Sequence, residues 1–138
     1  MESRFLTFII LILMLLVAGC DSSQKKTEPQ KFEDLYPGEL AEVTQIQLLN
    51  GSDGSRVTVT DQEAIHSFIE KIKEATFIPD ENQEEREGYR YAITLMEEDV
   101  EPFTFGVRSV GDTYYYTEPD ILPYVDELFL KFDEEPSE

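Results

Sequence analysis

Apolar Ile46 and Leu48 alternate with polar residues, and this period of two predicts a β-strand. After a turn over residues 51–54, the same alternation resumes at Val57 and Val59. A single register keeps these apolar side chains on one face, and it pairs Leu48 with Val57 and Ile46 with Val59. One face of this hairpin should therefore lie against a core.

A second hairpin is predicted over residues 89–108, because tyrosine, isoleucine, leucine and phenylalanine again occupy every second position. A three-residue loop at 98–100 keeps its apolar side chains on one face. That loop pairs Leu95 with Phe103, Ile93 with Phe105 and Tyr91 with Val107. A turn at 111–112 then leads into a further strand over 113–117, with Val107 paired to Tyr116. Of Tyr114, Tyr115 and Tyr116, two should face the core.

Two segments have the spacing of amphipathic helices. The first is predicted over 61–75, after a capping box that begins at Thr60, and the second begins at 117–119. Residues 77–88 contain Pro79 and many acidic side chains and are predicted to form an exposed loop. The order β-β-α-β-β-β-α predicts an α+β fold, an antiparallel sheet of about five strands with two helices on one face.

The N-terminal segment has a different character, because residues 5–18 are almost entirely apolar. Fourteen helical residues reach about 21 Å, which is short of the roughly 30 Å of bilayer hydrocarbon and typical of an export signal. Residues 20–39 are polar and contain two prolines, so we expect a flexible tether there. The single folded domain is expected over 40–138.

The apolar run ends in Val17, Ala18, Gly19 and Cys20, and this sequence resembles the lipobox of bacterial lipoproteins. The resemblance implies a diacylglycerol thioether on Cys20 and removal of the signal peptide, residues 1–19. It also implies an anchor on the outer face of the cytoplasmic membrane. A buried apolar cysteine and an uncleaved signal anchor are the alternatives. The chain as a whole loosely resembles small lipoproteins of Gram-positive bacteria, which supplies no activity.

Thirty acidic and eleven basic side chains give a formal net charge of −19. Such a charge repels phosphate backbones, so nucleic acid is not expected as a partner. Cys20 is the only cysteine and His66 the only histidine, and His66 lies beside the apolar stripe of its helix. No paired metal-ligand motif, phosphate loop or nucleophile setting is present in the sequence, so we expect neither a cofactor nor a metal, and no enzyme activity.

Acidic runs at 84–87, 97–101 and 133–135 could offer oxygen ligands to cations, although none has the spacing of an EF-hand loop. The sequence therefore predicts a monomeric, non-enzymatic binding or interaction module. Its partners would be the membrane, through the lipid, and an extracytoplasmic protein or cell-wall ligand. A cation- or cell-wall-ligand-binding module and a carboxylate-based hydrolase are the alternatives.

The strand registers nominate one candidate binding surface. They place Arg90 opposite Arg108, with Tyr115 beside Arg108, on the sheet face away from the helices. Two cross-strand arginines repel each other unless a negative group lies between them. That group could be a glutamate of the 84–87 loop, or it could be a carboxylate-bearing ligand held by both guanidinium groups and Tyr115.

Overall fold

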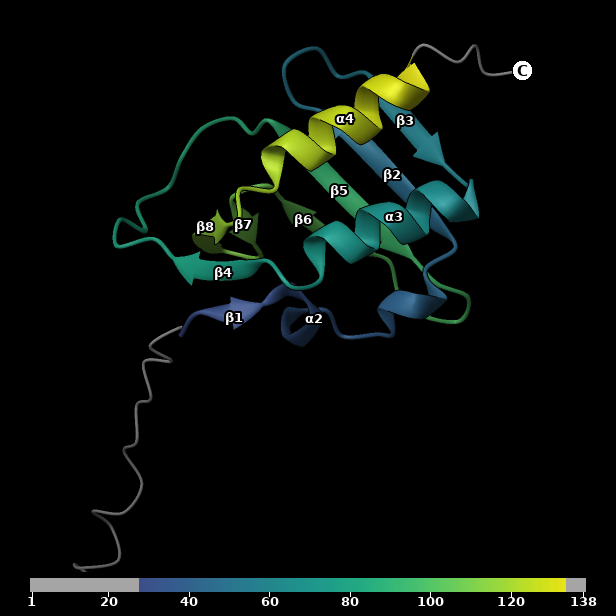
Figure 1. Ribbon diagram of the computed structural model, residues 1–138. Coiled ribbons are helices and arrows are strands. Elements are labelled where there is room, and N and C mark those ends of the chain that lie inside the picture. The colour runs from purple at the N-terminus through teal and green to yellow at the C-terminus, as the bar shows by residue number, and fades with distance from the viewer. Residues whose placement is uncertain (1–27, 134–138) are drawn as a thin grey trace, which may run out of the picture.

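The computed structural model describes residues 28–133, which form an eight-stranded antiparallel sheet with helices (Figure 1). In spatial order the sheet runs β1-β4-β8-β7-β6-β5-β2-β3. The strands are β1 (Gln30–Lys31), β2 (Gln45–Asn50), β3 (Arg56–Val59), β4 (Thr76–Pro79), β5 (Tyr91–Met96), β6 (Phe103–Gly106), β7 (Ser109–Val110) and β8 (Thr113–Glu118). The predicted signal peptide, Cys20 and the first part of the predicted tether lie outside the described residues.

Three α-helices accompany the sheet: α2 (Phe32–Leu35), α3 (Gln62–Ile72) and α4 (Leu122–Asp133). A 3-10 turn, η1 (Leu40–Glu42), precedes β2. Helices α3 and α4 pack beside each other across the same face of the sheet (Figure 1). The predicted α+β class and antiparallel sheet are confirmed. The predicted counts are wrong, because β1, β4, β7 and α2 were not expected.

The first predicted hairpin register is confirmed, and the second is confirmed except for the pair Tyr91 with Val107, because its ladder ends at Ala92 and Gly106. Leu48 pairs with Val57 and Ile46 with Val59, and the second hairpin pairs Leu95 with Phe103 and Ile93 with Phe105. Strand β2 also pairs with β5, which joins the two hairpins into one sheet. The alternating side chains of these strands therefore form one continuous apolar layer beneath α3 and α4.

The helix ends differ from the prediction. The carboxylate of Asp61 accepts the backbone N–H of Ala64 at 2.8 Å, so Asp61 rather than Thr60 caps α3. Helix α4 begins at Leu122 instead of 117–119, because β8 continues to Glu118 and pairs there with Thr76. Strand pairing with a distant segment outweighs the local helix-start signal at these residues.

The predicted loop over 77–88 is wrong at its start. Residues 76–79 form β4 between β1 and β8, and the Phe77 side chain is fully buried. Only four residues belong to this strand, too few for a period of two to stand out in the sequence. Residues 81–90 are exposed, as the prediction has it.

The domain begins before residue 40, which corrects the predicted tether boundary. Phe32 is fully buried, with its ring centroid 4.7 Å from that of Phe105 and 5.5 Å from that of Phe77. The hydroxyl of Tyr36, also buried, donates to the carboxylate of Glu97. These aromatic side chains are set in a polar segment without periodicity, so only the folded sheet shows that they complete the core.

A tight turn separates β6 from β7 and changes which side chains face the core. Gly106 pairs with Ser109, so the chain reverses at Val107 and Arg108 instead of continuing as one strand. The alternation then restarts, and Val110 packs against the core. Strand β7 pairs with β8 in the predicted register, Ser109 to Tyr114.

Candidate binding site

A hollow of about 260 Å³ opens where the loop after β4 meets the β6–β7 turn and the first residue of α4. We call it the arginine hollow, and it is defined by the lining residues Arg86, Arg90, Tyr91, Arg108, Tyr114 and Leu122. Residues 28–133 contain four arginines, and three of them line this one hollow. The chain as a whole has a net charge of −19, so this concentration of positive charge is local and distinctive.

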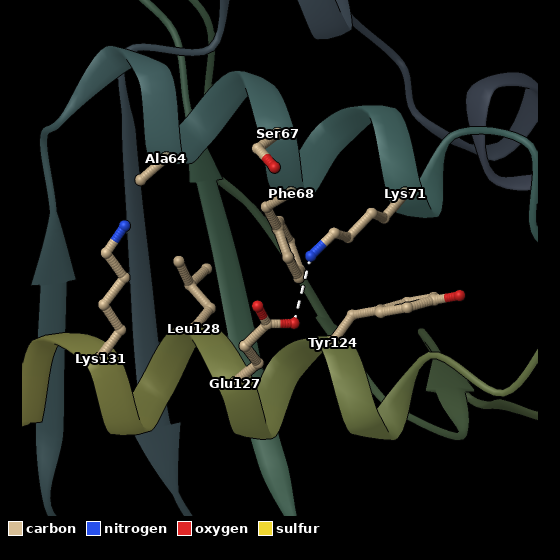
Figure 2. Close-up of a pocket in the computed structure, with 8 residues that line it drawn as sticks. All are labelled: Ala64, Ser67, Phe68, Lys71, Tyr124, Glu127, Leu128 and Lys131. Atoms are coloured by element: carbon tan, nitrogen blue, oxygen red, sulfur yellow. Dashed lines mark hydrogen bonds and ion pairs between the residues drawn. The ribbon is translucent and has the colours of Figure 1, made fainter.

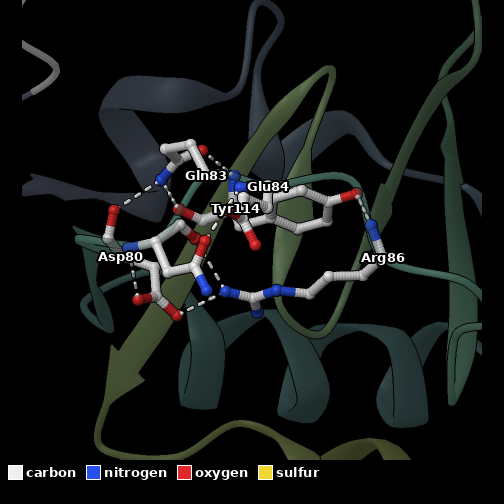
Figure 3. A network of polar contacts seen from close by, with 6 residues as sticks. Asp80, Gln83, Glu84, Arg86 and Tyr114 are labelled. Carbon is white, nitrogen blue, oxygen red and sulfur yellow. Dashed lines mark hydrogen bonds and ion pairs between the residues drawn. The ribbon is translucent and has the colours of Figure 1, made fainter.

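Arg86 is held rigidly in the wall of the hollow. Its Nη2 donates to Asp80 Oδ2 at 2.9 Å and to the carbonyl of Asn82 at 2.8 Å. Its guanidinium carbon lies 4.6 Å from the ring centroid of Tyr114. Figure 3 shows the side chain running along that ring to reach Asp80. The hydrogen bond from Arg86 is the main reason that the pKa of Asp80 is lowered. Arg86 is thus paired with a carboxylate at 2.9 Å.

Gln83 attaches the same loop to β8. Its amide nitrogen donates to the carbonyl oxygens of Asp80 and Tyr114, at 2.6 and 2.9 Å. Its amide oxygen accepts the backbone N–H of Tyr114 at 2.9 Å (Figure 3). The Gln83 side chain thus pairs with β8 as a short piece of strand would, and it fixes the loop wall of the hollow.

Arg90 carries a weakly compensated charge. Its Nη2 lies 3.6 Å from Asp126 Oδ1, its Nη1 is 3.4 Å from Ser52 Oγ, and the side chain is 52% exposed. Its guanidinium carbon is 5.4 Å from the ring centroid of Tyr91. An exposed ion pair at this distance contributes little to stability, so Arg90 is available to a ligand at small cost.

Arg108 stands in the β6–β7 turn and is exposed. Within residues 28–133, no carboxylate lies at ion-pair distance from its guanidinium group. The pKa of Asp80 is lowered mainly by hydrogen bonds from Arg86 and Asn82, and the positive charge of Arg108 adds a smaller effect in the same direction. Arg108 is therefore the uncompensated cation of the hollow.

The predicted pairing of Arg90 with Arg108 needs correction. The β5–β6 ladder ends at Ala92 and Gly106, so the two arginines are not cross-strand neighbours. They come together instead as lining residues of the same hollow. Glu87, a glutamate of the 84–87 loop, also lines the hollow, but within the described residues it forms no ion pair with Arg90 or Arg108.

Tyr115 is not part of the hollow. Its backbone N–H donates to the carbonyl of Arg108 at 2.8 Å, but its side chain is 4% exposed and packs edge-on against Phe77. The restart of the alternation after the β6–β7 turn sends Tyr115 inward. Tyr114 lines the hollow in place of Tyr115, and its hydroxyl oxygen accepts a hydrogen bond from the backbone N–H of Arg86 at 3.0 Å. The prediction that two of Tyr114, Tyr115 and Tyr116 face the core is also wrong, because Tyr116 is exposed.

A second, smaller hollow of about 70 Å³ lies between α3 and α4. Figure 2 shows Lys71 of α3 reaching across it to Glu127 of α4, with Nζ and Oε2 3.1 Å apart. The ammonium group also lies 5.6 Å from the ring centroid of Tyr124. Lys71 and Glu127 satisfy each other across this small hollow, so it is a contact between helices and a weak candidate for a ligand site.

The sheet face away from the helices carries a shallow hollow of about 270 Å³ between β3, β2, β5 and β6. The predicted neighbours Ala92 with Gly106 and Thr94 with Thr104 are confirmed there, and the two threonine hydroxyls lie 2.8 Å apart. Arg56 is its one charged lining residue. This surface has little charge or shape to select a ligand.

The single histidine, the metal-ligating side chains and the length of the helices within residues 28–133 bear on other kinds of function. His66 is exposed on α3. Among residues 28–133, no three or more His, Cys, Asp or Glu side chains are arranged to hold a metal ion. None of the helices over this range has the length and apolar character needed to cross a membrane. Comparisons with protein-family models, curated proteins and solved structures gave no significant match.

Proposed function

We propose that this protein is a lipid-anchored, non-enzymatic binding module on the outer face of the cytoplasmic membrane, with the arginine hollow as its binding site. The anchor is inferred from Val17–Cys20, which resembles a lipobox. The site is inferred from the charge distribution. Its ligand would be an anionic group of an extracytoplasmic protein or cell-wall component.

One observation carries the choice of site. In a strongly acidic chain, Arg108 and Arg90 line one hollow, and neither is fully compensated by a carboxylate of the described residues. A surface arginine in such a protein has many acidic side chains available as partners. Placing one unpaired and one weakly paired cation around one concave surface leaves a field that attracts an anion.

The rigid setting of the hollow also supports binding. Gln83 and Arg86 fix the loop wall, and the backbone of β6 and β7 forms the opposite side. A wall that is ordered before the ligand arrives loses little conformational entropy when the ligand binds. The hollow therefore has the properties of a preformed recognition site.

The proposal is tested by crosslinking in intact cells that carry the full chain. We expect Arg108→Ala and Arg90→Ala each to reduce capture of the partner while leaving the melting temperature within about 2 °C of the wild type, as for an exposed side chain. Arg56→Ala is the matched control, because Arg56 is an arginine outside the hollow. Equal capture by all four proteins would refute the hollow as the site.

A further inference from the structure

The geometry points to the class of ligand: we propose that the arginine hollow binds a carboxylate attached to an apolar body. This inference rests on the proposed function, because it names the ligand of the same site. The carboxylate would lie between Arg108 and Arg90, and the apolar body against Tyr91, Val107 and Leu122, all of which line the hollow.

The choice of a carboxylate follows from the type and number of the cations. All three basic residues that line the hollow are arginines, whose planar guanidinium groups match the two oxygens of a carboxylate. Arg86 already pairs with Asp80, so the positive charge left to a ligand is that of Arg108 and the weakly paired Arg90. Glu87 is also in the lining and opposes a second negative charge. A singly charged anion fits this balance better than a phosphate dianion.

The choice of an apolar body follows from the rest of the lining. Leu122 is half-buried and offers hydrocarbon surface next to the cations, whereas Val107 and Tyr91 are buried and add only the edges of their side chains to the lining. A Cβ at Gly106 would lie 2.5 Å from Ser109 Oγ, so glycine at this position permits the close approach of β6 and β7 that forms one wall of the hollow. Tyr89 also lines the hollow and is 52% exposed, one of four large hydrophobic residues of the described chain with such exposure. Its ring could be covered by a bound apolar group.

The volume limits the size of the ligand. A hollow of about 260 Å³ is somewhat smaller than the pockets of roughly 300 to 1,000 Å³ that hold drug-sized molecules. One carboxylate with a single aromatic or branched aliphatic group is of suitable size. Two sources share this chemistry: the C-terminal residue of a peptide, and a free small acid.

The test uses the purified full chain in detergent and measures binding by calorimetry. The probes are 3-phenylpropionate, a tripeptide ending in phenylalanine with a free carboxylate, the same tripeptide as its C-terminal amide, and inorganic phosphate. We expect the free-acid probes to bind at least about tenfold more tightly than the amide, since a charge-assisted hydrogen bond is lost with the carboxylate. A stronger response to the tripeptide than to 3-phenylpropionate assigns the peptide source, and the reverse order assigns the small acid.

Variants separate the hollow from the rest of the surface. Arg108→Ala and Arg90→Ala should each weaken binding of the better acid probe by about tenfold or more, whereas Arg56→Ala should change it by less than twofold. Equal binding of acid and amide, tighter binding of phosphate, or no binding of any probe would overturn the carboxylate assignment. Arg108-dependent crosslinking in cells would still stand in that case and would preserve the proposed function. Loss of both results would refute the two together.

Discussion

Tyr91 of β5 donates its hydroxyl hydrogen to Asp126 of α4 over 2.7 Å, so a hydrogen bond joins the central sheet to the helix that covers it. The ring of Tyr91 also packs on Phe129, with centroids 5.4 Å apart. Burial, with the hydrogen bond to Asp126 as the second cause, raises the pKa of Tyr91 to about 12. The same tyrosine lines the arginine hollow, so this contact supports both the fold and the site.

This pKa predicts a loss of stability at alkaline pH. The folded protein holds the Tyr91 proton more tightly than the unfolded chain, whose tyrosine has the ordinary pKa of 10.0. The stabilisation is therefore complete below pH 10 and is lost as the pH rises through about 12. Urea unfolding between pH 8 and pH 12 should show this loss in the wild type.

Tyr91→Phe provides the comparison, because it keeps the ring against Phe129 and removes the hydroxyl. At neutral pH we expect it to lower the free energy of unfolding by about 1 to 2 kcal/mol, the usual effect of losing such a hydrogen bond. The variant should also lose part of the alkaline dependence that the wild type shows. Parallel curves for the two proteins would contradict the assigned role of the Tyr91 hydroxyl.

Phe32→Ala should destabilise the domain by about 3 to 5 kcal/mol, because it removes a fully buried aromatic ring from among Phe77 and Phe105. Leu35→Ala, three positions along the same helix and only partly buried, should cost clearly less. Denaturant unfolding measures both. A change below about 1 kcal/mol for Phe32→Ala would mean that the segment before residue 40 does not belong to the core. The cost for Phe105→Ala is expected in the same range.

Gln83→Ala should loosen the loop wall of the arginine hollow. It removes two hydrogen bonds to Tyr114 of β8, including the one that protects the backbone N–H of Tyr114, and one to the carbonyl of Asp80 within the loop. We expect this amide to exchange with solvent at least about tenfold faster, as measured by hydrogen–deuterium exchange. Glu85→Ala, in the same exposed loop, is the control and should leave that rate unchanged. Slow exchange in both variants would show that the loop is held by other contacts.

Cys20→Ala tests the anchor. If Cys20 is the lipidated N-terminus, intact mass spectrometry of the mature protein should show that residues 1–19 are absent and that a lipid is attached. The variant should be released from the membrane or mislocalised, because lipidation of Cys20 supplies the anchor. A mature wild-type protein that still carries Met1, or that is found outside the membrane fraction, would contradict the prediction.

The sequence predicted the parts of the fold that depend on neighbouring residues. The two hairpin registers were predictable because Ile46, Val59, Ile93 and Phe105 alternate with polar residues on strands joined by short loops. Strands β1 and β4 were not predicted, because they have only two and four residues, too few to show an alternation of apolar and polar side chains. Both also pair with segments that are distant in the sequence. Propensity alone does not contain that information.

In the candidate site too, features set by neighbouring residues were predicted and those set by distant contacts were not. Arg90 and Arg108 were nominated from strand registers, and the structure brings both to one hollow, although not as cross-strand neighbours. Tyr115 was misplaced because nothing in the local pattern indicated a turn at 107–108. Arg86 was missed because its contacts with Asp80 and the Tyr114 hydroxyl place it in the hollow, and no periodicity encodes such contacts.

The position of β1 at the sheet edge determines when the chain can finish folding. This strand is near the start of the domain, but its partner β4 follows only after α3, and the other partner of β4, β8, lies close to the end. Two residue pairs are too few to hold β1 before β4 and β8 have assembled. Closure of the core around Phe32 is therefore a late event that depends on contacts between remote parts of the sequence, which slow folding.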